Sequence, residues 1–300
     1  MSLHDFASIF WRFSMKIFIL GRGKTGTTAI LYKIAAGLPD CQAFSGGDVG
    51  KHLGDYENAV YKQTYSERKG RTLTAYRDHA AKTDYDRKIW MARDPRDAAV
   101  SRMLFRWHKG KWGQWKLYKR HLELVRRKEQ DPKSIPFHVL FGYIGENGRP
   151  LTADELVEME RGRYQQMSDF AESLGSDWFI FKYEDMIEKN YDALNEYLGF
   201  DVVDEAEIPT TTKKSKVVRK KAYGDWRHWY TEEDVNLFKP AYLPYMKTMG
   251  YDCNDWALSP NPVIEAEYSS MYMEGLIRKH TQYVIRSIKN FVLRPFVKSS

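Results

Sequence analysis

The sequence predicts an α/β protein built on a central parallel sheet, with a helical insertion and a helical C-terminal tail. Strand-like apolar runs recur at five places and helical patterns separate them, which is typical of βαβ units. In such units, ligands bind at the carboxyl ends of the strands. The runs lie around residues 16–20, 41–44, 72–76, 87–92 and 177–182.

The first run is followed by the glycine-rich segment GRGKTGTT, residues 21–28, and then by a helix-like stretch that ends near Ala36. Glycines allow backbone N–H groups to close around an anion at the positive end of a helix, and threonine hydroxyls donate further hydrogen bonds. Lys24 adds a full positive charge. The segment therefore predicts a phosphate-binding loop, although a tight turn with a surface lysine has the same pattern.

The position of Lys24 argues against a nucleoside triphosphate as the ligand. The loop that binds such ligands has its lysine directly after the second glycine, where this chain has Thr27. A kinase built on this loop would lack the lysine that reaches the β and γ phosphates. A P-loop nucleotide kinase therefore stays open only as an alternative.

A second candidate segment follows the run at 87–92. Arg93, Asp94 and Pro95 open a predicted helix that contains Ser101. Asp94 is expected to cap this helix and Pro95 to occupy its first turn. A guanidinium makes paired, charge-assisted bonds to phosphate oxygens, and a hydroxyl two turns along can add one more. Arg93 and Ser101 are therefore candidates for binding a second phosphate.

The loop at 21–28 and the R-D-P-R-D-x-x-x-S pattern at 93–101 together resemble the two phosphate-binding signatures of the sulfotransferases that use 3′-phosphoadenosine 5′-phosphosulfate (PAPS). The resemblance implies a P-loop-like three-layer sandwich over residues 15–260, with an insertion at about 107–150, and sulfuryl transfer to a hydroxyl. It implies that Arg93 and Ser101 bind the 3′-phosphate. It assigns the 5′-phosphosulfate to Gly23, Lys24, Thr25, Gly26, Thr27 and Thr28.

Two later segments extend the resemblance. The run at 177–182 and its Y-E-D turn resemble a strand and turn in which the family's tyrosine lies against the adenine, which implies that role for Tyr183. Residues 219–226, RKKAYGDW, resemble a loop that closes over the nucleotide. The match implies contacts to the 3′-phosphate from Arg219 and Lys220.

The chain departs from the family at two positions. Lys221 stands where the family has a glycine, and Ala29 stands where many members have a tryptophan that stacks on adenine. The contact of the 219–226 loop with phosphate is therefore expected to differ or to shift by one residue. Stacking on adenine is expected to be weaker or to come from another residue, with Trp226 and Tyr223 as candidates.

Sulfuryl transfer needs an acceptor hydroxyl in line with the sulfate and stabilisation of the leaving phosphate. The resemblance implies that Lys24 stabilises the charge on that phosphate. His79 is the candidate base, because small-molecule members have a histidine after the third strand and imidazole titrates near neutrality. Carbohydrate-type members often use a glutamate, so Glu57 and Asp78 stay open. The scheme requires no metal, and we find no Asp or His cluster that would supply one.

Composition agrees with a soluble enzyme that binds an anion. The 300 residues have a net charge of +7, which suits a nucleotide with several phosphates. Cys41 and Cys253 belong to no metal-binding pattern and are compatible with a reducing cytoplasm. There is no apolar run of the ~18 residues that a membrane span needs and no signal-peptide core. We expect a cytoplasmic enzyme; a nucleotide- or polyanion-binding module without turnover is the alternative.

The segment at 107–150 alternates aromatic and basic residues in its first part. Aromatic faces stack on sugar rings and cations pair with acidic groups, so we expect a hydroxyl on a carbohydrate or a lipid-linked glycan as acceptor. Single-stranded nucleic acid fits the same mixture, as does a solvated helix whose tryptophans dock on the body. Nucleic acid is not expected as a partner, because the chain has no named nucleic-acid motif.

Helical patterns are also predicted at 153–174 and 232–249, and in the tail at 261–300. From 275 to 300 the tail has no acidic residue, and its basic residues alternate with an apolar helical face. Such a helix can lie on an anionic membrane surface. It can equally pack on its own domain or on a second subunit. Peripheral membrane association and a homo-oligomer both stay open.

Overall fold

The computed structural model describes residues 14–46, 54–65, 72–108, 114–144, 149–210 and 219–278. The chain divides into two compact units, and each is described by itself. Unit 1 comprises Met1–Ala92 and Ser173–Glu207, and unit 2 comprises Arg93–Glu172 and Ile208–Ser300. The boundary expected at residue 260 stays a prediction.

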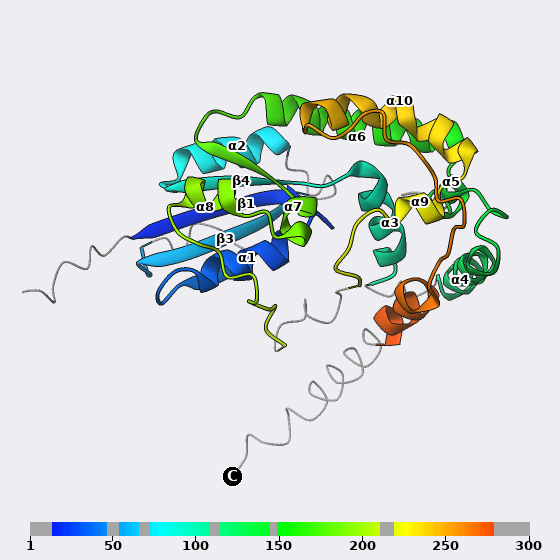
Figure 1. Cartoon of the computed structure of the whole chain (residues 1–300), viewed down its shortest axis with the longest axis horizontal. Helices are drawn as coiled ribbons and strands as arrows, with labels where there is room; N and C mark the ends of the chain where they lie inside the picture. The colour runs from blue at the N-terminus through cyan, green and yellow to red at the C-terminus, as the bar shows by residue number, and fades with distance from the viewer. Residues whose placement is uncertain are drawn as a thin grey trace, which may run out of the picture. The chain divides into compact units, whose positions relative to one another are not determined.

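Unit 1 contains a five-stranded sheet with the strand order β2-β3-β1-β4-β5 (Figure 1). Every neighbouring pair is parallel, so all five carboxyl ends lie at one edge of the sheet. This confirms the predicted α/β fold with a central parallel sheet. The strands are β1 (Met15–Arg22), β2 (Gln42–Ser45), β3 (Asn58–Tyr65), β4 (Arg87–Ala92) and β5 (Trp178–Lys182).

Alternate residues of the central strands are buried on opposite faces, which explains why β1 is an unbroken apolar run. Ile17 and Ile19 pack in one core with residues of α1, α7 and α8. Phe18 faces the other side, where it stacks on Tyr85 at 5.0 Å between ring centroids. Figure 1 shows α2 on the face opposite α1. The helices of this unit are α1 (Thr27–Ala36), α2 (Leu73–Lys82), α7 (Tyr183–Glu188) and α8 (Asp192–Leu198).

The strand predicted at 72–76 is wrong, because these residues begin α2. The Thr72 side chain caps the helix by accepting a hydrogen bond from the Ala75 N–H. The strand that occupies this place in the sheet is β3, which the sequence did not reveal. Its buried residues include Lys62 and Gln63, and these polar side chains interrupt the apolar pattern from which strands are inferred.

Unit 2 is helical. The predicted helices at 153–174 and 232–249 are confirmed as α6 and α10, which lie side by side. Glu160 of α6 is fully buried and accepts a hydrogen bond from Tyr242 of α10 at 3.0 Å. The elements are α3 (Pro95–Phe105), α4 (Trp115–Gln130), α5 (Phe137–Phe141), α6 (Ala153–Glu172), α9 (Trp226–Trp229), α10 (Glu232–Thr248) and the short η3 (Ala266–Tyr268).

The segment predicted as a helical insertion contains α4 and α5, while 109–113 and 145–148 lie outside the described residues. Trp107 is buried and donates from its indole nitrogen to His121 Nδ1 at 2.9 Å. Some of the aromatic residues that suggested a binding surface in 107–150 therefore belong to the core.

Of the predicted tail helix at 275–300, the described part extends to 278 and is helical, and the remainder lies outside the described residues. Within the ranges that the structure describes, we find no helix with the length and apolar character needed to cross a membrane.

Candidate phosphate-binding site

The loop between β1 and α1 has the backbone of an anion-binding turn. Lys24 and Gly26 both have positive φ angles, 78° and 82°, and Gly26 directly precedes the first residue of α1. A lysine in this region of backbone space is strained, and such strain is concentrated at functional sites. The loop therefore turns sharply into the positive end of a helix, with a lysine at the turn.

Close packing holds this loop against the sheet. A Cβ atom on Gly21 would lie 2.6 Å from Thr27 Cγ2 and 2.8 Å from both Met91 Cβ and Thr25 Oγ1, so position 21 requires glycine. Thr25 and Thr27 are buried. The Thr25 hydroxyl donates to the carbonyl of Arg22 at 2.8 Å. Of the residues predicted to bind phosphate, Thr25 thus also keeps the loop closed.

Two side chains from other parts of unit 1, one directly after β5 and one within β3, reach the loop. Tyr183, the first residue after β5, packs against Gly26, where an added Cβ would lie 2.7 Å from its ring. Lys62 of β3 is 4% exposed and donates from Nζ to Thr28 Oγ1 at 2.9 Å. The structure therefore brings Tyr183 to the predicted loop and adds a second lysine there. The sequence offers no usable signal for Lys62, because β3 was not predicted and a lysine by itself argues against a buried strand.

The three candidates for the base lie elsewhere in unit 1. His79 is in the last turn of α2, a helix that returns from the carboxyl edge of the sheet toward the start of β4. The expectation that it follows a strand is wrong, since the preceding residues are helical. Asp78 neighbours it on α2 and pairs with Arg77 at 3.5 Å. Glu57 directly precedes β3, at the amino edge of the sheet.

In unit 2, helix α3 begins as the sequence predicts. Asp94 caps it by accepting a hydrogen bond from the Arg96 N–H at 2.9 Å, and Pro95 is its first residue. Arg93 follows β4 directly along the chain, and Ser101 lies two turns into the helix. Both side chains are buried.

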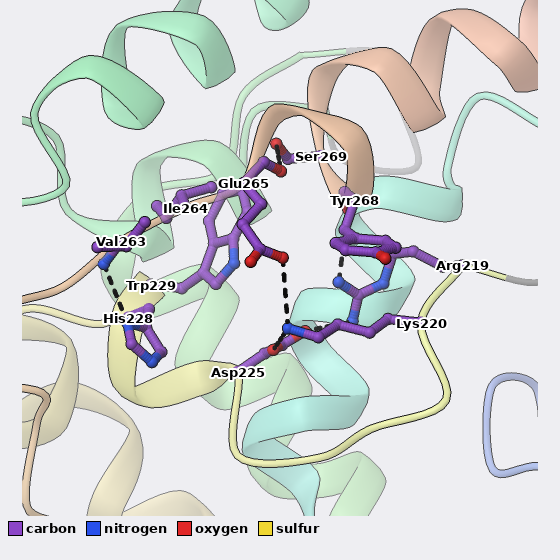
Figure 2. A pocket seen from close by; sticks show the side chains of 10 residues that line it. All are labelled: Arg219, Lys220, Asp225, His228, Trp229, Val263, Ile264, Glu265, Tyr268 and Ser269. Carbon is purple, nitrogen blue, oxygen red and sulfur yellow. Dashed lines mark hydrogen bonds and ion pairs between the residues drawn. The ribbon is translucent and has the colours of Figure 1, made fainter.

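Arg219 and Lys220 are engaged with carboxylates of their own unit. Arg219 Nη2 lies 2.8 Å from Asp225 Oδ2, and Lys220 Nζ lies 3.4 Å from Asp225 Oδ1 and 3.6 Å from Glu265 Oε2 (Figure 2). Burial by itself would raise the pKa of Asp225, but the two cations hold it below its ordinary value. These groups line a pocket of about 120 Å³ that Tyr268 also borders. A phosphate that binds Arg219 or Lys220 would share these cations with the carboxylates, because a guanidinium has five N–H donors and an ammonium three.

Trp226 does not offer a face for adenine. It is 1% exposed, and the guanidinium carbons of Arg96 and Arg227 lie 4.0 and 4.6 Å from its ring centroid. Cation–π contacts of this kind use the aromatic face that a base would need. The expected stacking by Trp226 is therefore wrong, whereas Tyr223 is 41% exposed.

A search of the described residues for three or more His, Cys, Asp or Glu side chains arranged to hold a metal ion finds no such group.

Comparisons with known proteins find similarity among solved structures. No family model matches the sequence, and no curated protein matches it. Among solved structures, the fold is similar to the crystal structure of mouse sulfotransferase SULT7A1 complexed with PAP, with 15% sequence identity and a TM-score of 0.41. The alignment covers 78% of this chain and 84% of that chain.

Proposed function

We propose that this chain transfers the sulfuryl group of PAPS to an acceptor hydroxyl. The observation that carries the proposal is the loop after β1, in which Lys24 sits at a strained turn before a helix N-terminus. Lys62 adds a second ammonium group beside Thr28 at the start of that helix. A helix N-terminus with two lysines favours a phosphate or phosphosulfate group.

The same geometry disfavours the kinase alternative. The residue after Gly26 is Thr27, which is buried and packs within contact distance of Gly21. The lysine of the triphosphate-binding loop is therefore absent from its place, and the charge stands three residues earlier, at Lys24.

A second phosphate is proposed to bind Arg93 and Ser101. Sheet register places Gly21 of β1 opposite Met91 of β4, so the segments that follow these strands leave the same edge of the sheet. Ligands of parallel α/β sheets bind at this edge. A 3′-phosphate on the adenosine distinguishes PAPS from AMP and ATP, and it is the group for which we propose the Arg93 guanidinium.

In the proposed reaction, the acceptor oxygen forms a bond to sulfur while the bond between sulfur and the bridging oxygen breaks. The hydroxyl proton leaves to a base, and the electron pair of the broken bond stays on the 5′-phosphate of the adenosine bisphosphate. Lys24 is proposed to neutralise this new charge, which lowers the barrier because the interaction is strongest in the transition state.

The acceptor is proposed to be a carbohydrate or a lipid-linked glycan. Trp115 of α4 is 52% exposed, and Lys119 Nζ lies 5.5 Å from its ring centroid. Lys119 uses one face of this ring, but the side chain is half exposed, and an exposed aromatic group with a cation suits a sugar that carries an acidic group.

Calorimetry tests the donor. The full chain should bind 3′,5′-adenosine bisphosphate more tightly than AMP, and more tightly than ATP with magnesium. Transfer of labelled sulfate from PAPS to a panel of glycans, glycolipids and phenols then tests the reaction. Preference for ATP, together with no transfer to any acceptor, would exclude the proposed function in favour of a kinase.

A further inference from the structure

Asp97, in the first turn of α3, connects two segments that are far apart in the sequence. It is 1% exposed. Its Oδ2 accepts a hydrogen bond from the Gly224 N–H at 2.6 Å, and its Oδ1 accepts one from the Trp226 N–H at 3.2 Å. One carboxylate therefore holds two amides of the 219–226 loop, with one oxygen for each.

These two amides flank Asp225, the residue that binds both cations of the loop. Gly224 has a φ of 84°, a conformation that favours glycine. Its carbonyl accepts a hydrogen bond from Arg227 at the start of α9. The anchoring of residues 224 and 226 thus fixes the backbone on both sides of Asp225. The position of its carboxylate in turn determines where Arg219 and Lys220 lie.

Some of the groups around Asp97 raise its pKa and others lower it. Burial disfavours its ionised form most strongly, and Asp94 and Asp225 add repulsion. Arg93 and the Gly224 amide favour the ionised form. The net result raises the pKa of Asp97 to about 6. Protonation would convert one acceptor oxygen into a hydroxyl, so only the carboxylate accepts both amides.

We propose that Asp97 is a positioning residue, whose two oxygens hold the 219–226 loop on α3 and thereby keep Arg219 and Lys220 with the helix that carries Ser101. The part of this inference that concerns ligand binding rests on the proposed function, because Arg219 and Lys220 are proposed to bind the 3′-phosphate. The part that concerns how Asp97 holds the loop does not depend on any ligand.

Asp234 provides a matched control. It is fully buried and accepts backbone N–H groups from Phe137 at 2.7 Å, His138 at 2.8 Å and Thr231 at 2.8 Å. These amides belong to the starts of α5 and α10 and not to the 219–226 loop. Asp234→Asn therefore removes the same kind of buried carboxylate from the same unit without touching the loop.

The experiment compares the full-length wild type, Asp97→Asn and Asp234→Asn by hydrogen exchange and by calorimetry. Asparagine presents an amino group to one of the two N–H donors, so exchange at Gly224 and Trp226 should rise about tenfold or more in Asp97→Asn. The ratio of affinities for 3′,5′-adenosine bisphosphate and AMP should fall in this variant. Asp234→Asn should lower stability and leave that ratio unchanged.

The anchoring is overturned if Asp97→Asn leaves exchange in the loop unchanged. The positioning role is overturned if the affinity ratio falls equally in both variants. A wild type that binds the bisphosphate no better than AMP refutes the proposed function, and the exchange measurement still decides the anchoring.

Discussion

Gly26→Ala tests how the phosphate loop is held in unit 1. The substitution has two costs that the structure separates. Alanine at a φ of 82° costs about 1–2 kcal/mol, because its Cβ approaches the following carbonyl. The same Cβ would lie 2.7 Å from Tyr183 Cδ2 and 3.0 Å from Met186 Cε, and such overpacking costs about 1–3 kcal/mol. We expect the free energy of unfolding to fall by about 2–5 kcal/mol.

Gly199→Ala is the control for the backbone cost. Gly199 belongs to the same unit and has the same φ of 82°, but in the part of the chain that the structure describes, no atom beyond its immediate chain neighbours lies within 4 Å of the position that its Cβ would occupy. This variant should lose only about 1–2 kcal/mol. The difference between the two variants measures the contact of residue 26 with Tyr183 and Met186.

Urea denaturation of the full chain, with the m value checked for constancy, provides these free energies. Two further variants complete the comparison: Tyr183→Ala alone, and Tyr183→Ala combined with Gly26→Ala. Since the ring is then missing, the cost of Gly26→Ala should approach that of Gly199→Ala. Equal losses for Gly26→Ala and Gly199→Ala, or a cost that persists without the ring, would show that Tyr183 does not pack on this loop as described.

Three further predictions concern the charged groups. Lys24→Ala should lower kcat about 100-fold or more, as expected when one donor to the leaving group is removed, while affinity for the bisphosphate product falls less; an unchanged kcat would contradict this role. Arg93→Ala should weaken binding of 3′,5′-adenosine bisphosphate by about 10–100-fold and leave AMP binding nearly unchanged, as calorimetry can measure; equal losses for both ligands would contradict a 3′-phosphate contact. For Asp97, the folded chain raises the pKa from 3.8 to about 6, so its contribution to stability is complete below about pH 4 and is lost as the pH rises through about 6. The unfolding free energy of the wild type relative to Asp97→Asn should therefore fall by up to about 3 kcal/mol over this range, and a difference that does not depend on pH would contradict the burial argument.

The segments that were predicted correctly are specified by sequence patterns that involve only neighbouring residues. β1, its glycine-rich loop and α1 follow from an apolar run, closely spaced glycines and a helical pattern. The start of α3 follows from Asp94 as cap and Pro95 in the first turn. Such signals depend on neighbours within one or two turns, so a sequence contains them in full.

The segments predicted wrongly depend on burial by distant parts of the chain. β3 is a strand because β2 and β1 pair with both of its edges, and its Lys62 is satisfied in part by Thr28 of another element. In the sequence, the same lysine is evidence against a buried strand. Because of the mistaken strand at 72–76, His79 was expected to follow a strand, whereas it lies in the last turn of α2.

Only the tertiary structure decided how the candidate site is held together. The sequence by itself determined which residues carry the phosphate-binding signatures: Lys24 in its loop, Arg93 before its helix, and the Arg219-Lys220 pair. It did not show that Asp97 bonds to Gly224, 127 positions away, or that Asp225 binds both cations of its own loop. These contacts form because folding buries a carboxylate among backbone amides and guanidinium groups, and no local pattern records which distant donors will meet it.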